Sequence, residues 1–208
     1  MTALPLRKIS YQADEIAPLS VEQYHRMIAE GILEDGAPVE LLDGVLVWKD
    51  RGGAMTVSPR HSLVVTRLLQ LASRLAGSGA HLRIQNPVTI RPNHEPEPDA
   101  SIVLGEPADY ADRHPGPREV TSVIEVAETS LERDRTVKLS LYARAEIPQY
   151  VLINLAQSKV EVYEEPDPMG TTYRKVRLLQ TADTVSLLLP DGRRLEVVAS
   201  DLGIGSRR

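Results

Sequence analysis

The sequence predicts an α/β fold in which a central mixed β-sheet is flanked by helices and followed by additional antiparallel strands at the C-terminus. Three observations predict this class. Residues 119–155 read as a strand, a turn, a helix and a second strand. Residues 38–50 read as two short strands around Asp43-Gly44, a strong two-residue hairpin signal. Residues 160–198 contain four short apolar segments at regular spacing, separated by turn signals such as Asp191-Gly192, and we expect them to form an antiparallel meander beside the core sheet.

Length and composition narrow the class of protein. A chain of 208 residues fits one large domain, so we expect a single domain over residues 1–208 with an N-terminal arm over residues 1–18. The chain is 42% hydrophobic and 25% charged, which is typical of globular proteins, and it has no cysteine to form disulfides or thiolate metal sites. No apolar run approaches the roughly 18 residues that a membrane span needs. The N-terminus lacks the apolar region of a signal peptide, so we expect a cytoplasmic protein with no membrane partner.

The first elements have local start and stop signals. Ser20 and Gln23 fit a capping box, which predicts an amphipathic helix that ends near Gly31. In the first strand of the hairpin, Glu40 lies between apolar neighbours. It is either an exposed strand carboxylate or a member of an acidic site, and the local sequence leaves both interpretations open.

A second helix is predicted over residues 61–77, after a turn-rich connector at residues 51–60. Its core face is marked by leucines at helical spacing, namely Leu68, Leu71 and Leu75. The sequence Gly77-Ser78-Gly79 ends it. His61 lies in the first turn, where a histidine is either a surface or capping residue or a ligand.

The middle of the chain brings acidic residues to the start of a strand. Residues 81–90 read as a strand interrupted at Asn86-Pro87, and residues 105–118 as a surface loop. Between them, alternate prolines hold residues 95–99 in an extended conformation. Asp99 therefore leads directly into the short apolar strand 100–104.

The central stretch contains a carboxylate in an apolar strand. Glu125 lies within the β-branched run at residues 123–126, and burying it costs several kcal/mol unless a cation or hydrogen bonds compensate. Thr129 and Glu132 fit a capping box, so we expect a helix from there to about Ala145, before the strand at residues 149–155.

The predicted helix offers one cation that could compensate. Asp134, Lys138 and Tyr142 recur at intervals of four residues and lie along one face. One interpretation is an ordinary ion pair between Asp134 and Lys138 on the helix surface, worth a few tenths of a kcal/mol. The other turns this face toward Glu125 and places Lys138 beside a carboxylate cluster.

Carboxylates from two strands would suit a hard divalent cation. If the strands of Asp99 and Glu125 are adjacent, both acids can contact one Mg²⁺ ion, which prefers oxygen ligands and usually keeps several waters. Glu40 could be a third acidic group. A bound metal would offset the burial of Glu125, polarise a phosphodiester and lower the pKa of a bound water. Lys138 could orient that water or stabilise negative charge in the transition state.

At these residues the sequence resembles the Uma2 family, a branch of the PD-(D/E)XK nuclease superfamily. The resemblance extends from about Glu40 to Leu202 and rests on motifs that are specific in combination, namely ELLDG, Pro59-x-His61, QNPVTI, EPEPD, EVAETS and IPQYVLINL. It implies a restriction-endonuclease-like core. It also implies an active-site set made of Asp99, Glu125, Glu40, Lys138 and His61. We expect Asp99, Glu125 and Glu40 to be the metal ligands.

The sequence departs from the superfamily pattern in one important position. Ala127 occupies the third position of the E-x-K motif that begins at Glu125, so Lys138 would have to supply the lysine from the helix. Asn154 stands where members of the family often have aspartate.

Together, these observations predict a Mg²⁺- or Mn²⁺-dependent endonuclease that hydrolyses phosphodiester bonds, with DNA as its partner. Two alternatives stay open: a non-catalytic module of the same fold that binds nucleic acid or a protein, and a hydrolase of smaller phosphoesters. The net charge of −5 argues against indiscriminate nucleic-acid binding, which relies on neutralising phosphates with lysine and arginine. A homodimer is an open expectation.

Overall fold

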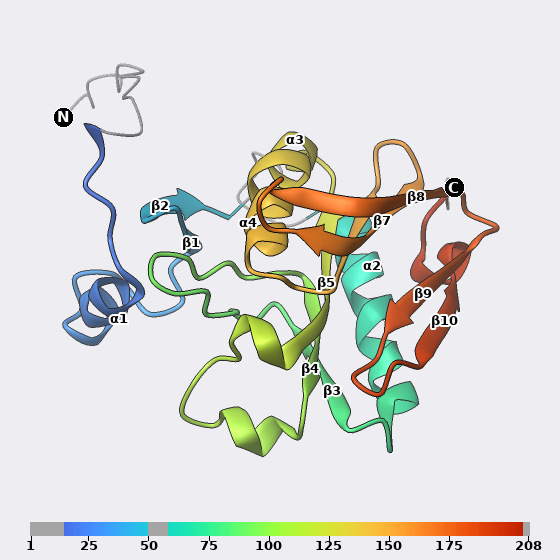
Figure 1. Cartoon of the computed structure of the whole chain (residues 1–208), viewed down its shortest axis with the longest axis horizontal. Coiled ribbons are helices and arrows are strands. Elements are labelled where there is room, and N and C mark those ends of the chain that lie inside the picture. The colour runs from blue at the N-terminus through green and yellow to red at the C-terminus, as the bar shows by residue number, and fades with distance from the viewer. Residues whose placement is uncertain (1–14, 50–57, 206–208) are drawn as a thin grey trace.

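A six-stranded mixed sheet forms the centre of the computed structural model, which describes residues 15–49 and 58–205 (Figure 1). The strands lie side by side in chain order, and only β5 and β6 are parallel to each other. Their bounds are β3 (Ala80–Ile84), β4 (Ala100–Leu104), β5 (Val120–Ala127), β6 (Gln149–Asn154), β7 (Lys159–Asp167) and β8 (Thr172–Leu179). The predicted α/β class is confirmed. Most of the predicted arm and of the connector at residues 51–60 lies outside the described residues.

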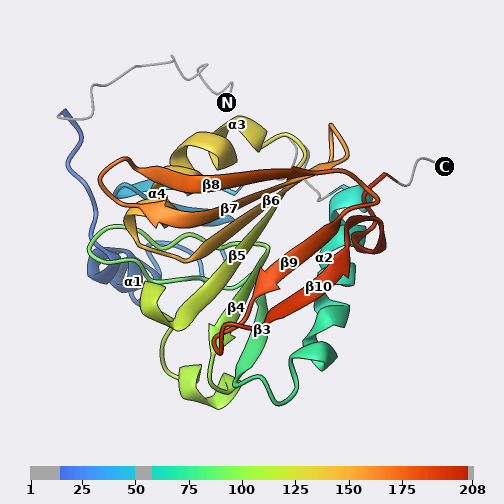
Figure 2. The same ribbon diagram turned by 45° about the vertical axis from the view of Figure 1, so that its right-hand side comes forward.

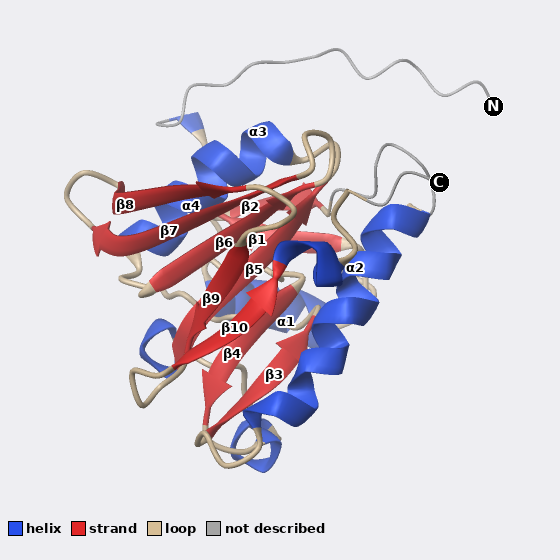
Figure 3. Cartoon of the chain, turned by 90° about the vertical axis from the view of Figure 1, so that its right-hand side faces the viewer, coloured by secondary structure: helices blue, strands red, loops and turns tan. Residues whose placement is uncertain are grey.

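Both faces of the sheet are covered. One face packs against α2 (Pro59–Gln70), its 3₁₀ continuation Leu71–Leu75, and the hairpin of β9 (Thr184–Leu188) and β10 (Arg194–Val198). Figures 2 and 3 show this hairpin lying across the sheet beside α2. The predicted leucine face of α2 is buried there. The other face packs against α4 (Leu139–Arg144). None of the helices in the described ranges is both long and apolar enough to cross a membrane.

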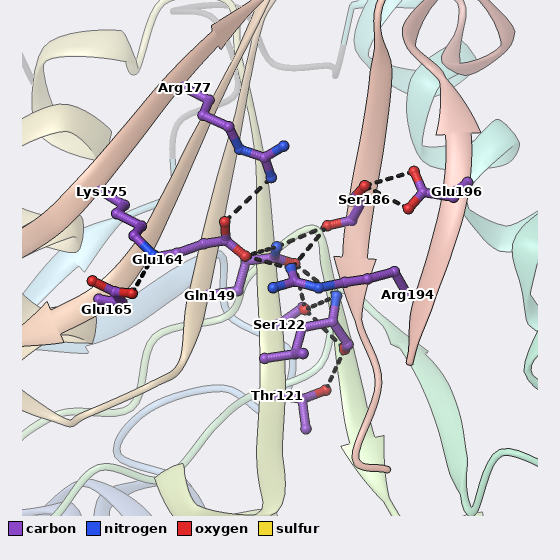
Figure 4. A network of polar contacts seen from close by, with 11 residues as sticks. Thr121, Ser122, Gln149, Glu164, Glu165, Lys175, Arg177, Ser186, Arg194 and Glu196 are labelled. Carbon is purple, nitrogen blue, oxygen red and sulfur yellow. Dashed lines mark hydrogen bonds and ion pairs between the residues drawn. The ribbon is translucent and has the colours of Figure 1, made fainter. Parts of the chain in front are cut away.

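The C-terminal strands do not form the single meander that their spacing predicts. β7 and β8 extend the central sheet, whereas β9 and β10 form a separate two-stranded sheet. Side chains of the central sheet bind the backbone of β9 in place of a strand ladder (Figure 4). Leu188 N donates to Gln149 Oε1 at 2.9 Å, Gln149 Nε2 donates to Ser186 O at 2.8 Å, and Thr121 Oγ1 donates to Leu188 O at 2.8 Å. These buried side-chain bonds satisfy backbone groups that a continuous meander would have paired.

The N-terminal part of the domain follows its local signals. In α1 (Val21–Ala29), Ser20 and Gln23 form both hydrogen bonds of the predicted capping box. The hairpin of β1 (Val39–Leu42) and β2 (Val45–Trp48) turns at Asp43-Gly44 as predicted. The hairpin is attached to the segment before β4, because Glu95 N donates to Leu41 O at 2.8 Å. This attachment brings β1 toward the start of β4.

The helix after β5 differs from the prediction. α3 (Leu131–Arg133) begins after Ser130, which is its N-cap and makes no side-chain cap bond, so the helix starts one residue after the position that a Thr129 cap predicts. The Ser130 hydroxyl instead donates to Asp134 Oδ2 at 2.5 Å. A wider π-helical turn, Asp134–Lys138, then leads into α4. The helix ends at Arg144, with Ala145 as its C-cap, in agreement with the prediction.

Gly44 provides a test of the hairpin that carries Glu40. Gly44 has φ +73°, and a Cβ added there would lie 2.3 Å from Pro18 Cβ. We expect Gly44→Ala to lower the free energy of unfolding by about 2–3 kcal/mol, because it combines left-handed strain with a clash. The matched control is Gly31→Ala, which has φ +68° and no atom within 4 Å. The control should lose only about 1 kcal/mol in urea unfolding. Equal losses in the two variants would contradict the clash.

Candidate active site

The five residues singled out by the sequence converge on one cavity. It has a volume of about 220 Å³ and is lined by all of them. The side chains come from β1, the first turn of α2, the entrance to β4, the middle of β5 and the π-helical turn. The pairing of β4 with β5 brings two of these side chains together. Ala100 pairs with Ile124 in the antiparallel β4–β5 ladder, so the two strands are adjacent and Asp99 lies opposite Glu125. Asp99 Oδ2 also accepts a hydrogen bond from Val126 N at 2.8 Å.

Lys138 points into the carboxylate cluster and not along the helix surface. Its Nζ lies 2.9 Å from Glu125 Oε1 and 3.2 Å from Glu40 Oε2, and its side chain is only 7% exposed. The π-helical turn buries both Asp134 and Lys138. Such turns are rare within helices and are frequent at functional sites. Burial alone would lower the pKa of Lys138, but the negative charges of Glu125 and Glu40 raise it above the ordinary lysine value. Lys138 is therefore a fixed positive charge at neutral pH.

For Glu125, by contrast, the surroundings favour the neutral, protonated form of the side chain. Burial raises its pKa well above the usual range, Lys138 opposes that shift, and the neighbouring acids Asp134, Asp99 and Glu40 reinforce it. Its Oε1 accepts hydrogen bonds from Lys138 Nζ and from Tyr142 Oη, both at 2.9 Å. Within the described part of the chain, Oε2 receives no donor. One oxygen is thus fixed by the protein, and the other is available to a ligand.

Glu40 and His61 both support this cluster. Glu40 is 2% exposed, so the interpretation as an exposed strand carboxylate is wrong. Its Oε2 accepts from Glu97 N at 3.1 Å as well as contacting Lys138. His61 Nε2 lies 3.1 Å from Asp99 Oδ1. Burial lowers the pKa of His61, but its contact with Asp99 raises the pKa further, and the net shift is upward.

The cavity is also lined by residues that the sequence did not assign to the site. Asp134 is buried and lines it, and burial raises the pKa of its carboxyl group. Its position one helical interval before Lys138 was the available signal. Lys49 and Glu97 also line the cavity and form an ion pair with each other. Glu97 lies in the acidic run before β4, whereas no local signal placed Lys49 there.

Acidic groups outnumber cations in the cavity. Among the described residues, its lining contains five carboxylates (Glu40, Glu97, Asp99, Glu125 and Asp134) and three cations (Lys49, Arg133 and Lys138). Within residues 15–49 and 58–205, no three His, Asp or Glu side chains gather closely enough to form a metal-binding group by themselves. A Mg²⁺ ion that keeps most of its waters needs only one or two carboxylates. The adjacent acids Asp99 and Glu125, with Glu125 Oε2 available, fit that requirement.

A comparison with known families now places the chain. The model of the Uma2 family, described as "Putative restriction endonuclease", matches residues 21–198. The chain belongs to the Uma2 family. The structure also resembles the crystal structure of a protein from Anabaena variabilis ATCC 29413 that is described as a putative nuclease belonging to DUF820. The TM-score is 0.65, with 15% identity, over 89% of this chain and 97% of the other, which shows a common fold. No curated protein matches this sequence.

The Uma2 family match supports a nuclease-like role, and the structure places a lysine beside Glu125 although the E-x-K position holds alanine. Ala127 lies two residues beyond Glu125 in β5 and is fully buried. The ammonium group beside Glu125 belongs to Lys138 instead. Asn154 pairs with Ala127 across the β5–β6 ladder and hydrogen-bonds to Gln157, and it does not line the cavity. A positive charge therefore lies beside the strand glutamate although the motif lacks its lysine.

The raised pKa of Glu125 predicts how its replacement changes stability with pH. The unfolded chain releases this proton near pH 4.3, whereas the folded protein retains it to higher pH, so Glu125 reduces stability as pH rises between these values. The unfolding free energy of Glu125→Gln relative to wild type should therefore increase from pH 4 to pH 7, measured by urea unfolding.

Glu161 gives a control of opposite sign. It is also a buried strand glutamate; burial raises its pKa, but hydrogen bonds from Arg135 and Tyr163 lower the pKa further, so the net shift is downward. Glu161→Gln should lose stability relative to wild type over the same pH interval. The same trend in both variants would contradict the electrostatic difference between the two sites.

Proposed function

We propose that this member of the Uma2 family is a Mg²⁺- or Mn²⁺-dependent endonuclease that hydrolyses phosphodiester bonds in DNA. The observation that carries the proposal is the buried contact between Lys138 Nζ and Glu125 Oε1, in a cavity that also contains Asp99. Burying ionic groups costs desolvation free energy. A domain that needed only its fold would therefore be at least as stable with apolar residues at these positions.

Two carboxylates are proposed as the metal ligands. Asp99 and Glu125, the latter through Oε2, would hold the cation, and Glu40, which lines the same cavity, would be the third acidic group. When bound, the metal would supply Lewis acidity toward a phosphate oxygen and lower the pKa of a coordinated water. Lys138 and Tyr142 hold the Glu125 carboxylate in place through Oε1. His61 holds Asp99 through its contact with Oδ1.

Lys138 is proposed to stabilise negative charge that develops on the phosphate. Its raised pKa keeps the ammonium protonated at neutral pH, so it cannot take a proton from water. A buried, preorganised charge is effective because it needs no reorientation during the reaction. The proton of the attacking water therefore has to leave through another group or to solvent.

A non-catalytic module that binds nucleic acid or a protein is the second candidate. Ala127 in the E-x-K position favours it, because the lysine of the superfamily motif is missing from the strand. Both candidates keep the acidic cavity, and they differ in whether a metal ion in it leads to cleavage.

Metal binding should be visible as stabilisation. A ligand that binds only the folded state at 100 times its dissociation constant adds about 2.7 kcal/mol of stability. We therefore expect millimolar Mn²⁺ to raise the thermal midpoint of the wild type but not of Asp99→Asn. Asp191→Asn, in the exposed turn between β9 and β10, is the control and should keep the full shift. Equal shifts in wild type and Asp99→Asn would mean that the metal does not bind in this cavity.

Cleavage separates the enzyme from the binding module. Purified wild type should nick a supercoiled plasmid with Mn²⁺ and not with EDTA. The double variant Asp99→Asn/Glu125→Gln should lose nicking yet bind DNA without metal at least as well as wild type, because two negative charges near the phosphate are gone. Lys138→Met keeps the length of the side chain and should retain the Mn²⁺ shift while cleavage falls at least about 100-fold.

The negative outcomes are informative in this assay. Nicking that persists in the double variant would mean a contaminating nuclease or the wrong residues. If wild type nicks neither duplex nor single-stranded DNA, the non-catalytic module becomes the favoured function.

A further inference from the structure

A second lysine stands at the edge of the cavity. Lys49 follows β2 directly, and its backbone is fixed by a hydrogen bond from Lys49 N to Pro38 O at 2.9 Å. Its Nζ is paired with Glu97 Oε2, and both side chains are 22% exposed. Both side chains keep some access to solvent, so an anion that enters the cavity can compete with Glu97 for the ammonium group.

The two lysines of the cavity have different freedom. Lys138 contacts two carboxylates and is nearly inaccessible, so its ammonium cannot move toward a group outside the cavity. Lys49 contacts one carboxylate among the described residues and lies nearer to solvent. A lysine ammonium has three N–H donors, so pairing with Glu97 leaves two for another anion.

Lys49 also lies where two cavities meet. Together with Gln85 and Glu97 it lines both the acidic cavity and a neighbouring cavity of about 540 Å³. The second cavity extends past Tyr24 and His25 of α1. A polymer with one phosphate at the metal proposed for Asp99 and Glu125 could therefore continue past Lys49 into the second cavity. A small phosphoester would not extend that far.

We propose that Lys49 is a substrate-binding residue, which contacts a phosphate of the nucleic-acid backbone next to the one that the metal proposed at Asp99 and Glu125 would hold. Glu97 is its counter-ion in the free protein and releases the ammonium to the phosphate when the substrate binds. This inference rests on the proposed function for its substrate class, and it adds that the substrate is a strand running from the acidic cavity into the second cavity.

The salt dependence of DNA binding tests the contact. Binding is measured by fluorescence anisotropy in EDTA with the Asp99→Asn/Glu125→Gln protein, on labelled duplex and single-stranded DNA, over a range of KCl concentrations. Each phosphate contact contributes about 0.9 to the slope of log K against log salt for duplex DNA and about 0.7 for a single strand. Adding Lys49→Gln should reduce the slope by that amount and weaken binding about 10-fold.

Three further variants make the result specific. Lys175→Gln removes the same charge from an exposed lysine paired with Glu165 at the outer edge of the sheet, and it should leave the slope unchanged. Glu97→Gln releases Lys49 without removing it, so binding should be as tight as before or tighter, with the slope retained. Lys49→Arg should also retain the slope, because the guanidinium keeps the charge.

Kinetics then separates this inference from the proposed function. In proteins with an intact acidic site and Mn²⁺, Lys49→Gln should raise KM about 10-fold with little change in kcat, whereas Lys138→Met lowers kcat. If wild type does not cleave DNA, the proposed function fails while the binding slopes still decide on Lys49. If Lys49→Gln and Lys175→Gln have equal effects on the slope, or if the double variant binds neither DNA, the inference about Lys49 is overturned.

Discussion

The burial of the Glu125 carboxylate in the central sheet is the constraint on which the rest of the site depends. An ionisable group in this position has to find partners, because leaving it alone in an apolar sheet would cost several kcal/mol. Its partners, Lys138 and Tyr142, both come from the helical segment after β5. The connection from β5 to β6 is therefore fixed by a polar contact to the sheet as well as by apolar packing. The π-helical turn is the backbone conformation in which this contact is made.

The negative charge of the buried carboxylates is compensated only in part. Lys138 lies between Glu40 and Glu125, but Asp99 and Asp134 add further negative charge, and burial raises the pKa of both Glu125 and Asp134. A protein selected only for stability would not collect so many acids in one buried place. Such strained clusters are characteristic of functional sites, where the missing charge is supplied by a ligand. In the proposed function, a divalent cation would supply this missing positive charge.

The position of the lysine shows that a charge constellation is defined by geometry and not by sequence order. The E-x-K pattern would place the lysine two residues after Glu125, where this chain has Ala127. Lys138 brings its ammonium to 2.9 Å from the same carboxylate from a different element. The role proposed for Lys138 depends on where its charge lies and not on its place in the sequence. The Lys49–Glu97 pair has no counterpart in the motif and was visible only in the folded cavity.

The sequence alone determined the features that depend on near neighbours in the chain. The Ser20 capping box, the Asp43-Gly44 turn and the apolar faces of helices and strands all act through backbone geometry and side-chain periodicity within a few residues. The family motifs also indicated which residues belong together, without indicating how they meet.

Only the tertiary structure decided the features that depend on distant contacts. It buried Glu40, turned Lys138 toward Glu125, and placed the Ser130 hydroxyl on Asp134. It also separated β9 and β10 from the central sheet. In each case a local preference competed with the burial and hydrogen bonding of polar groups brought together from far apart in the chain. The distant contacts prevailed because an unsatisfied buried charge or amide costs more than a lost cap or a helix-surface ion pair stabilises.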